Sequence, residues 1–192
     1  RVVVGCGDGK VYCLSIADGS TLWSAPCGGP VYSSPAIDGS NVYIGSNGTG
    51  AAKSAYLYSL NLNTGAENWK YAADCAIESR PCFTSDVVFF GAWDSYFYAI
   101  HKATGALKWR YQRNASRYYS PADSWPVASE SAGRVFVADR QYYMNAINIA
   151  TGEADWTRTG VSSQALTDDA TGLLQRVSAG TLERTTFDNT AG

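Results

Sequence analysis

Residues 57–69 read LYSLNLNTGAENW, and this stretch decides the fold because its pattern recurs along the chain. Anchored on tryptophan, four segments align without a gap: LSIADGSTLW (14–23), LNLNTGAENW (60–69), IHKATGALKW (100–109) and INIATGEADW (147–156). Successive tryptophans are 46, 40 and 47 residues apart, a period that suits one propeller blade of four short strands. The repeated glycines and tryptophans are Gly19, Trp23, Gly65, Trp69, Gly105, Trp109, Gly152 and Trp156.

Each part of the repeat predicts one part of an antiparallel blade. The tetrads Val11–Leu14, Leu57–Leu60 and Phe97–Ile100 are β-prone with a small third residue, as a buried third strand between neighbouring sheets requires. The Asp-Gly or Thr-Gly pair that follows supplies a capping side chain and a residue free to take positive φ, which predicts a tight turn. The tryptophan then falls on the outer strand, where it can bury on the order of 200 Å² against the next blade.

The other two strands of each blade lie upstream of the turn. Second strands are predicted at 42–45, 88–91 and 135–138, each apolar and ending in a small residue. Pro35 and Pro81 each lie 12 residues after a tryptophan and mark innermost strands, where an unpaired edge tolerates the missing N–H. Pro121 keeps this spacing in the fourth blade, but we favour Trp125-Pro126 there, with an insertion around 113–123.

Together these strands predict an all-β chain that forms part of a propeller ring. Three full blades (28–74, 75–113 and 114–160) lie between blade parts at 1–27 and 161–192. In the last part Phe187 matches the position of Leu14, and Gly192 matches Gly19. We expect the missing blades to come from a longer chain or from a second copy, because either would cover the open sheet edges.

The repeat resembles that of the quinoprotein-like propellers, a family that includes pyrroloquinoline-quinone alcohol dehydrogenases and the propeller lipoprotein of the outer-membrane β-barrel assembly machinery. The family signature is Y-x-L-D-x-x-T-G-x-x-x-W, and the resemblance covers nearly the whole chain. The acidic position holds Ser15, Asn61, His101 and Asn148 here, so we expect weaker hydrogen bonding at the blade corners. The resemblance implies an exported bacterial protein, periplasmic or extracellular.

Composition excludes several partners. Only 17% of the residues are charged and the net charge is -2, so we expect no nucleic acid or anionic lipid to bind. The longest apolar runs, such as 87–90, are far shorter than the ~20 residues of a membrane-spanning helix. Five cysteines, at 6, 13, 27, 75 and 82, lack zinc-site spacing and are expected in the core, although pairing of Cys75 with Cys82 stays open.

The residues that could suggest a phosphate-binding, catalytic or metal site each have a structural explanation. Gly5–Gly9 could suggest a phosphate loop, but a strand follows it rather than a helix, so we expect a hairpin turn. His101 has no partner for a nucleophilic or metal site at a suggestive spacing. A quinone-dependent dehydrogenase needs a calcium site, yet the loop carboxylates Glu78, Asp94, Asp123 and Asp139 are scattered and no adjacent cysteines occur. We expect no catalytic residue, metal ligand or cofactor; the alternative is pyrroloquinoline quinone with calcium.

The favoured function is a non-catalytic scaffold that binds a protein, peptide or glycan through its loops. A propeller gathers the outer-to-inner and second-to-third-strand loops on one face, and Arg, Trp and Tyr dominate interface hot spots. The alternatives are that Tyr118, Tyr119 and Trp125 only fill the insertion, and that the chain is a fragment of a pyrroloquinoline-quinone-dependent alcohol or sugar dehydrogenase. The predicted binding residues are Trp93, Asp94, Arg113, Arg117, Tyr118, Tyr119, Asp139 and Arg140.

Overall fold

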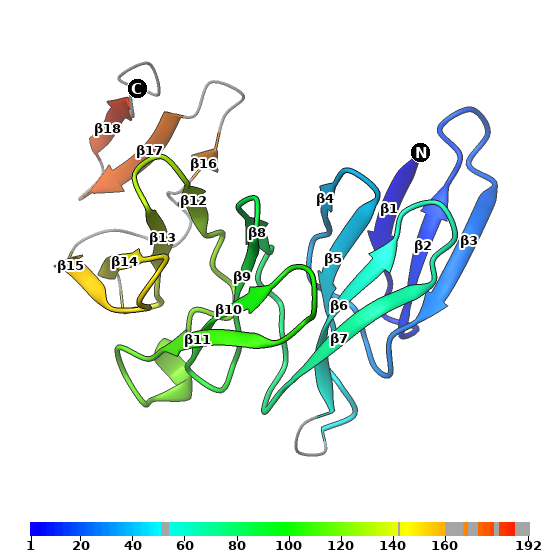
Figure 1. Cartoon of the computed structure of the whole chain (residues 1–192), viewed down its shortest axis with the longest axis horizontal. Coiled ribbons are helices and arrows are strands. Elements are labelled where there is room, and N and C mark those ends of the chain that lie inside the picture. The colour runs from blue at the N-terminus through cyan, green and yellow to red at the C-terminus, as the bar shows by residue number, and fades with distance from the viewer. Residues whose placement is uncertain (51–53, 142, 160–166, 169–172, 179–180, 187–192) are drawn as a thin grey trace.

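The computed structural model describes residues 1–192 except 51–53, 142, 160–166, 169–172, 179–180 and 187–192. Five antiparallel sheets follow one another along an arc in chain order (Figure 1). The first contains β1 (Val2–Gly5), β2 (Lys10–Leu14) and β3 (Thr21–Pro26), and the second contains β4 (Ala36–Asp38), β5 (Asn41–Gly45), β6 (Ala55–Asn61) and β7 (Glu67–Ala73). The third contains β8 (Cys82–Phe83), β9 (Val87–Gly91), β10 (Phe97–His101) and β11 (Leu107–Tyr111). The fourth contains β12 (Val127–Ser129), β13 (Arg134–Ala138), β14 (Tyr143–Asn148) and β15 (Ala154–Thr159), and the fifth β16 (Thr167–Asp168), β17 (Leu173–Ser178) and β18 (Thr181–Thr186).

The predicted all-β propeller blades are confirmed, with every strand paired to its neighbour in sequence. The second strands β5, β9 and β13 and the third strands β2, β6 and β10 occupy the predicted segments. The inner strand of the fourth sheet, β12, begins directly after Pro126. The prediction that Trp125-Pro126, rather than Pro121, marks this strand is confirmed. Pro121 instead packs on Gly91, where an added Cβ would lie 2.0 Å from the Pro121 carbonyl oxygen.

The hydrophobic core lies between adjacent sheets. One cluster joins Val11 and Cys13 of the first sheet to Ile44 and Leu60 of the second. Equivalent clusters join the second sheet to the third and the third to the fourth. The second and third sheets are each covered on both faces, so their middle strands are apolar on both sides, as in Val87–Gly91, which is buried throughout.

Each of the first three inter-sheet junctions is closed by a tryptophan of the preceding blade. The indole Nε1 of Trp23 donates to the Leu62 carbonyl at 2.9 Å. Trp69 and Trp109 donate in the same way to Lys102 and Ile149, both at 2.8 Å. The predicted docking of the tryptophans across blade junctions is therefore confirmed. The Phe187 and Gly192 positions predicted for the last blade lie outside the described residues.

The blade corners keep side-chain hydrogen bonds although the acidic residue of the family signature is replaced. The Asn61 Oδ1 accepts hydrogen bonds from the backbone N–H groups of Asn63 and Thr64 at 2.9 and 3.2 Å. Asn148 makes the same pair of bonds at 2.9 and 3.2 Å. The corner hydrogen bonds are therefore present with asparagine, whose neutral amide oxygen accepts them in place of a carboxylate. Weaker bonding than an aspartate would give stays a prediction. Ser15 keeps one such bond, from Ala17 at 3.2 Å.

Two further predictions concern the glycine-rich loop and the cysteines. Gly5–Gly9 turns between the paired strands β1 and β2, with Gly9 N–H donating to the Cys6 carbonyl, so the hairpin is confirmed. All five cysteines are free thiols in this structure, and Cys75 and Cys82 are not bonded to each other. Among the described residues no helix is long and apolar enough to cross a membrane.

Candidate functional site

One edge of the arc carries the loop face, the lower side of Figure 1. It consists of the second-to-third-strand connections 6–9, 46–50, 92–96 and 139–141, and the outer-to-inner connections 27–35, 74–81 and 112–126. Backbone hydrogen bonds join consecutive connections, as from Ile77 N–H to the Ser46 carbonyl and from Trp93 N–H to the Ala76 carbonyl. The loop face is therefore one continuous surface built from several blades.

Asp94 holds the turn between β9 and β10. The residue is only 8% exposed, and its carboxylate accepts hydrogen bonds from Asp74 N–H, Tyr96 N–H and the Tyr98 hydroxyl, the last at 2.6 Å. Burial, and then the hydrogen bond to Asp94, raise the pKa of Tyr98 well above its ordinary value. Asp8 and Tyr12 form the same pair at 2.6 Å in the first blade. A binding role for Asp94 stays a prediction, since its oxygens are engaged within the fold.

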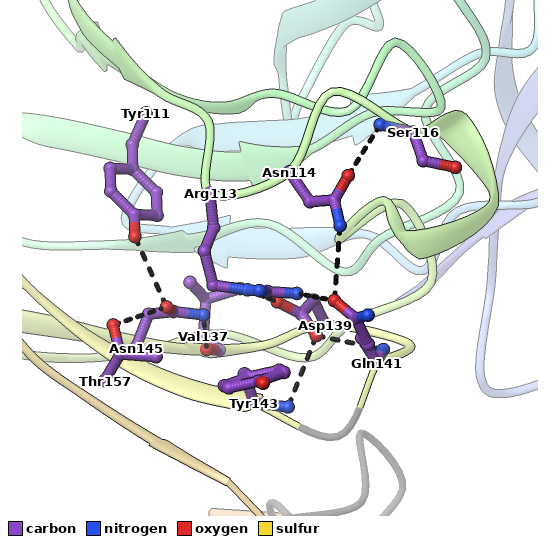
Figure 2. A network of polar contacts seen from close by, with 10 residues as sticks. All are labelled: Tyr111, Arg113, Asn114, Ser116, Val137, Asp139, Gln141, Tyr143, Asn145 and Thr157. Carbon is purple, nitrogen blue, oxygen red and sulfur yellow. Dashed lines mark hydrogen bonds and ion pairs between the residues drawn. The ribbon is translucent and has the colours of Figure 1, made fainter.

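Arg113 and Asp139 form the centre of a polar network between the third and fourth blades, which Figure 2 shows. The Arg113 guanidinium donates to Asp139 and, at 2.6 Å, to the Gln141 side chain. Its plane lies over the Tyr143 ring, 3.9 Å from the centroid. Asp139 is 5% exposed and also accepts from Gln141 N–H and Tyr143 N–H. Arg113 therefore clamps the insertion onto the β13–β14 turn.

Below this clamp Asn145 occupies the place that tyrosine holds in the other blades. Tyr58, Tyr98 and Asn145 each directly precede the residue paired with the blade tryptophan. The Asn145 oxygen accepts from Thr157 at 3.0 Å and Tyr111 at 3.3 Å. Asn145 is one of the residues that line a cavity of about 20 Å³, which is close to the size of one water molecule.

The exposed part of the predicted site is the Arg140 stack, defined as Trp93, Arg140 and Tyr118. The Arg140 guanidinium carbon lies 5.1 Å from the centroid of the Trp93 ring and 5.5 Å from that of Tyr118. Its Nε is 3.6 Å from Asp123 Oδ2, in a pair exposed to solvent. Tyr118 is 67% exposed, so its ring lies at the surface rather than in the interior of the insertion. Cation–π contact holds the three side chains together at the surface.

Glu78 and Asn47, which the sequence did not link to Trp93, hold the Trp93 indole in position. Its indole Nε1 donates to Glu78 Oε2 at 2.9 Å, and Glu78 Oε1 accepts from the Asn47 amide at 2.6 Å. These residues come from three successive loops of the face. Arg117 and Tyr119 flank the stack in the 3₁₀-helix η1 (Arg117–Tyr119), with Arg117 exposed and Tyr119 half-buried against Tyr118.

The carboxylates of the face do not fit a calcium–quinone centre. Those of Asp94, Asp139 and Glu78 are already bonded to protein N–H or O–H donors. Within the described part of the chain, no three His, Cys, Asp or Glu side chains are grouped so as to hold a metal ion. His101, exposed at its blade corner, contacts the turn only through backbone atoms. What the face offers is a fixed aromatic and cationic surface.

Comparisons with known proteins agree with this architecture. Residues 7–182 match the family described as "Outer membrane protein assembly factor BamB". The structure is similar to BamB from Moraxella catarrhalis, with a TM-score of 0.72 and 19% identity over 95% of this chain and 54% of that one. It also resembles the quinohemoprotein alcohol dehydrogenase of Comamonas testosteroni, with a TM-score of 0.65 and 15% identity over 95% of this chain and 37% of the enzyme.

A computationally designed protein, Ika8, shares the fold with a TM-score of 0.72 and 18% identity over 95% of this chain and 54% of its own. No curated protein matches the sequence. The chain thus spans about half the length of BamB and roughly a third of the dehydrogenase. By the match over most of its length, the chain belongs to the BamB-like family of quinoprotein-type β-propellers.

Proposed function

We propose that this chain belongs to a non-catalytic propeller scaffold of the bacterial envelope, periplasmic or extracellular, that holds a protein partner on its loop face. The Arg140 stack carries the proposal. Tyr118 and Arg140 are solvent-accessible, and Trp93 is half-buried beneath them. Tryptophan, tyrosine and arginine are the residue types that contribute most to interface hot spots.

The stack is held in place by contacts within the chain itself. Trp93 is fixed by Glu78, and Tyr118 lies on a short helix whose backbone bonds back to Ser116 through Tyr119 N–H. A surface that is already ordered pays less conformational entropy on binding than flexible side chains would. The family description, which refers to outer membrane protein assembly, further supports an envelope protein as the partner rather than a glycan.

Affinity capture from an envelope extract of the source bacterium tests this function, with the full-length protein as bait. A double variant, Tyr118→Ala and Arg140→Ala, removes two side chains of the stack. It should reduce recovery of the captured protein at least about 30-fold, because a hot spot contributes about 2 kcal/mol or more. Arg134→Ala is the matched control, since Arg134 is a similarly exposed arginine that pairs with Asp155 away from the loop face.

Equal recovery by all three baits would overturn the proposal. A second assay addresses the dehydrogenase alternative: the full-length protein is incubated with calcium and pyrroloquinoline quinone and assayed for dye-coupled oxidation of alcohols and sugars. Turnover above that of the unloaded protein would show that the propeller is an enzyme, and the scaffold function would fall.

A further inference from the structure

A second hollow lies away from the Arg140 stack, along the innermost strands. Its volume is about 300 Å³, much larger than the cavity beside Asn145. The walls come from three successive blades, through β4, β8 and β12. We name it the inner-strand groove, and its lining residues are Ala36, Ile37, Arg80, Pro81, Cys82, Phe83, Trp125, Pro126, Val127 and Ala128.

The groove is built on a repeated Ser-x-Pro triplet that precedes each inner strand: 33–35, 79–81 and 124–126. The serines are buried and bonded to the fold; Ser79 Oγ, for example, accepts from Gly91 N–H at 2.9 Å and donates to its carbonyl at 3.0 Å. The middle residue is exposed in every blade. The scaffold thus fixes serine and proline and leaves the middle position free to differ, as Ser34, Arg80 and Trp125.

The side chains of the lining are apolar except for one arginine, while polar groups such as the backbone make up about half of its exposed surface. Trp125 is 51% exposed and Ile37 46%, although both are large apolar side chains. Large apolar side chains that line a hollow offer packing surface for the apolar groups of a ligand. Arg80 is the one charged residue in the lining, and it makes no ion pair with any described residue. A ligand that complements this groove carries a negative charge next to apolar groups.

The shape of the groove favours an extended ligand. Sheets packed face to face lie about 10 Å apart, so a groove crossing three blades extends up to roughly 20 Å. An extended chain covers that distance with about six residues at roughly 3.3 Å each. Arginine binds carboxylates through two parallel hydrogen bonds, and an indole face accepts aromatic or aliphatic side chains.

We propose that the inner-strand groove binds an extended acidic peptide segment, with a carboxylate of the peptide on Arg80 and a neighbouring aromatic or aliphatic side chain on Trp125. This site is separate from the Arg140 stack and does not depend on the function proposed for it. It gives the propeller a second binding surface, on its inner strands.

Fluorescence anisotropy of the full-length protein with a fluorescein-labelled hexapeptide of alternating Glu and Phe tests the proposal. The probe should bind, and a Lys-Phe hexapeptide should bind at least about tenfold more weakly, because its charge opposes Arg80. Arg80→Gln and Trp125→Ala should each weaken the Glu-Phe probe about tenfold, and Arg80→Lys should do so less. Ser34→Ala is the matched control, since Ser34 holds the same position in the preceding blade but does not line the groove.

Both substituted side chains are exposed, so the variants should fold, which circular dichroism verifies. The proposal falls if the probe does not bind, or if Arg80→Gln binds it as well as the unmodified protein does. It also falls if free phenylacetate displaces the probe as effectively as unlabelled peptide, because the groove would then hold a small aromatic acid. The Tyr118→Ala, Arg140→Ala variant should retain probe binding, which separates this result from the capture experiment.

Discussion

Gly105 lies directly against the indole of Trp69 from the preceding blade, and a Cβ added to Gly105 would approach Trp69 Cδ2 to 2.8 Å. The same residue takes a φ of +72°, in the left-handed region. The Trp69 Nε1 meanwhile donates to Lys102, three residues before this glycine. The repeated glycine is therefore required twice over, by backbone conformation and by the docked ring.

Gly105→Ala should lower the free energy of unfolding by about 2–5 kcal/mol. The left-handed conformation costs a non-glycine residue roughly 1–2 kcal/mol, and forcing a methyl group against a packed ring adds about 1–3 kcal/mol. Gly133→Ala is the control, since Gly133 has a φ of +63° but nothing lies within 4 Å of its Cβ position. Urea denaturation measures both, and equal losses would mean that the indole moves aside at little cost.

Arg113→Ala should destabilise the fourth blade by about 3–5 kcal/mol, because it leaves the buried Asp139 carboxylate without its cation. Adding Asp139→Asn should recover part of this loss, since the uncompensated charge is then gone. Arg134→Ala breaks the exposed pair with Asp155 and should cost less than about 1 kcal/mol. Thermal or urea denaturation gives the comparison. If Arg113→Ala costs no more than Arg134→Ala, the clamp does not stabilise the blade.

Stability should fall at alkaline pH through the buried tyrosines. Burial, with a smaller contribution from Asp38, raises the pKa of Tyr43 from 10.0 to about 12. The unfolded chain releases this proton near pH 10 while the folded chain keeps it, so the stabilisation is complete below pH 10 and is lost as the pH rises toward 12. Other tyrosines with raised pKa values are Tyr58, Tyr71, Tyr98 and Tyr111.

Tyr43→Phe should remove about 1 kcal/mol of the loss of unfolding free energy between pH 9 and 11. Urea midpoints at the two pH values measure it. Tyr32→Phe, at an exposed position, is the control and should leave the pH dependence unchanged. A Tyr43→Phe protein that loses stability as steeply as the unmodified one would show that Tyr43 ionises freely in the fold.

Cys27 should resist alkylation in the folded protein. It is fully buried, and burial raises its pKa to about 12, so hardly any thiolate forms at pH 8. Iodoacetamide at pH 8 should modify the half-buried Cys6 and Cys75 and spare Cys27, whereas in urea all three should react. Mass spectrometry of the digested protein measures the extent of alkylation at each cysteine. Alkylation of native Cys27 as fast as Cys75 would mean that the junction of the first two blades opens readily.

The fold could be predicted because its determinants are local and repeated. Each strand, turn glycine and tryptophan lies within one 40- to 47-residue period, and four copies agree with one another. The choice between Pro121 and Trp125-Pro126 was correct for the same reason, since Ser124-Trp125-Pro126 matches the other triplets. The corner asparagines keep the turn hydrogen bonds because the turn needs an acceptor oxygen at this position, which an amide supplies.

The candidate sites depend on contacts that no repeat encodes. Trp93 and Arg140 come from different blades, and their contact depends on how two loops lie across the face. The cavity beside Asn145 and the Arg113 clamp above it likewise depend on side chains from different strands and loops.

The sequence by itself determined the blades, their order and the tryptophan docking, because hydrophobic period and turn chemistry act over a few residues. Only the tertiary structure decided which loop side chains are buried and hydrogen-bonded within the fold, as Asp94 and Asp139 are. It also decided which remain at the surface, as Tyr118 and Arg80 do. The physical reason is that burial and pairing of a loop side chain are set by neighbouring blades, whose approach is fixed only when the sheets pack together.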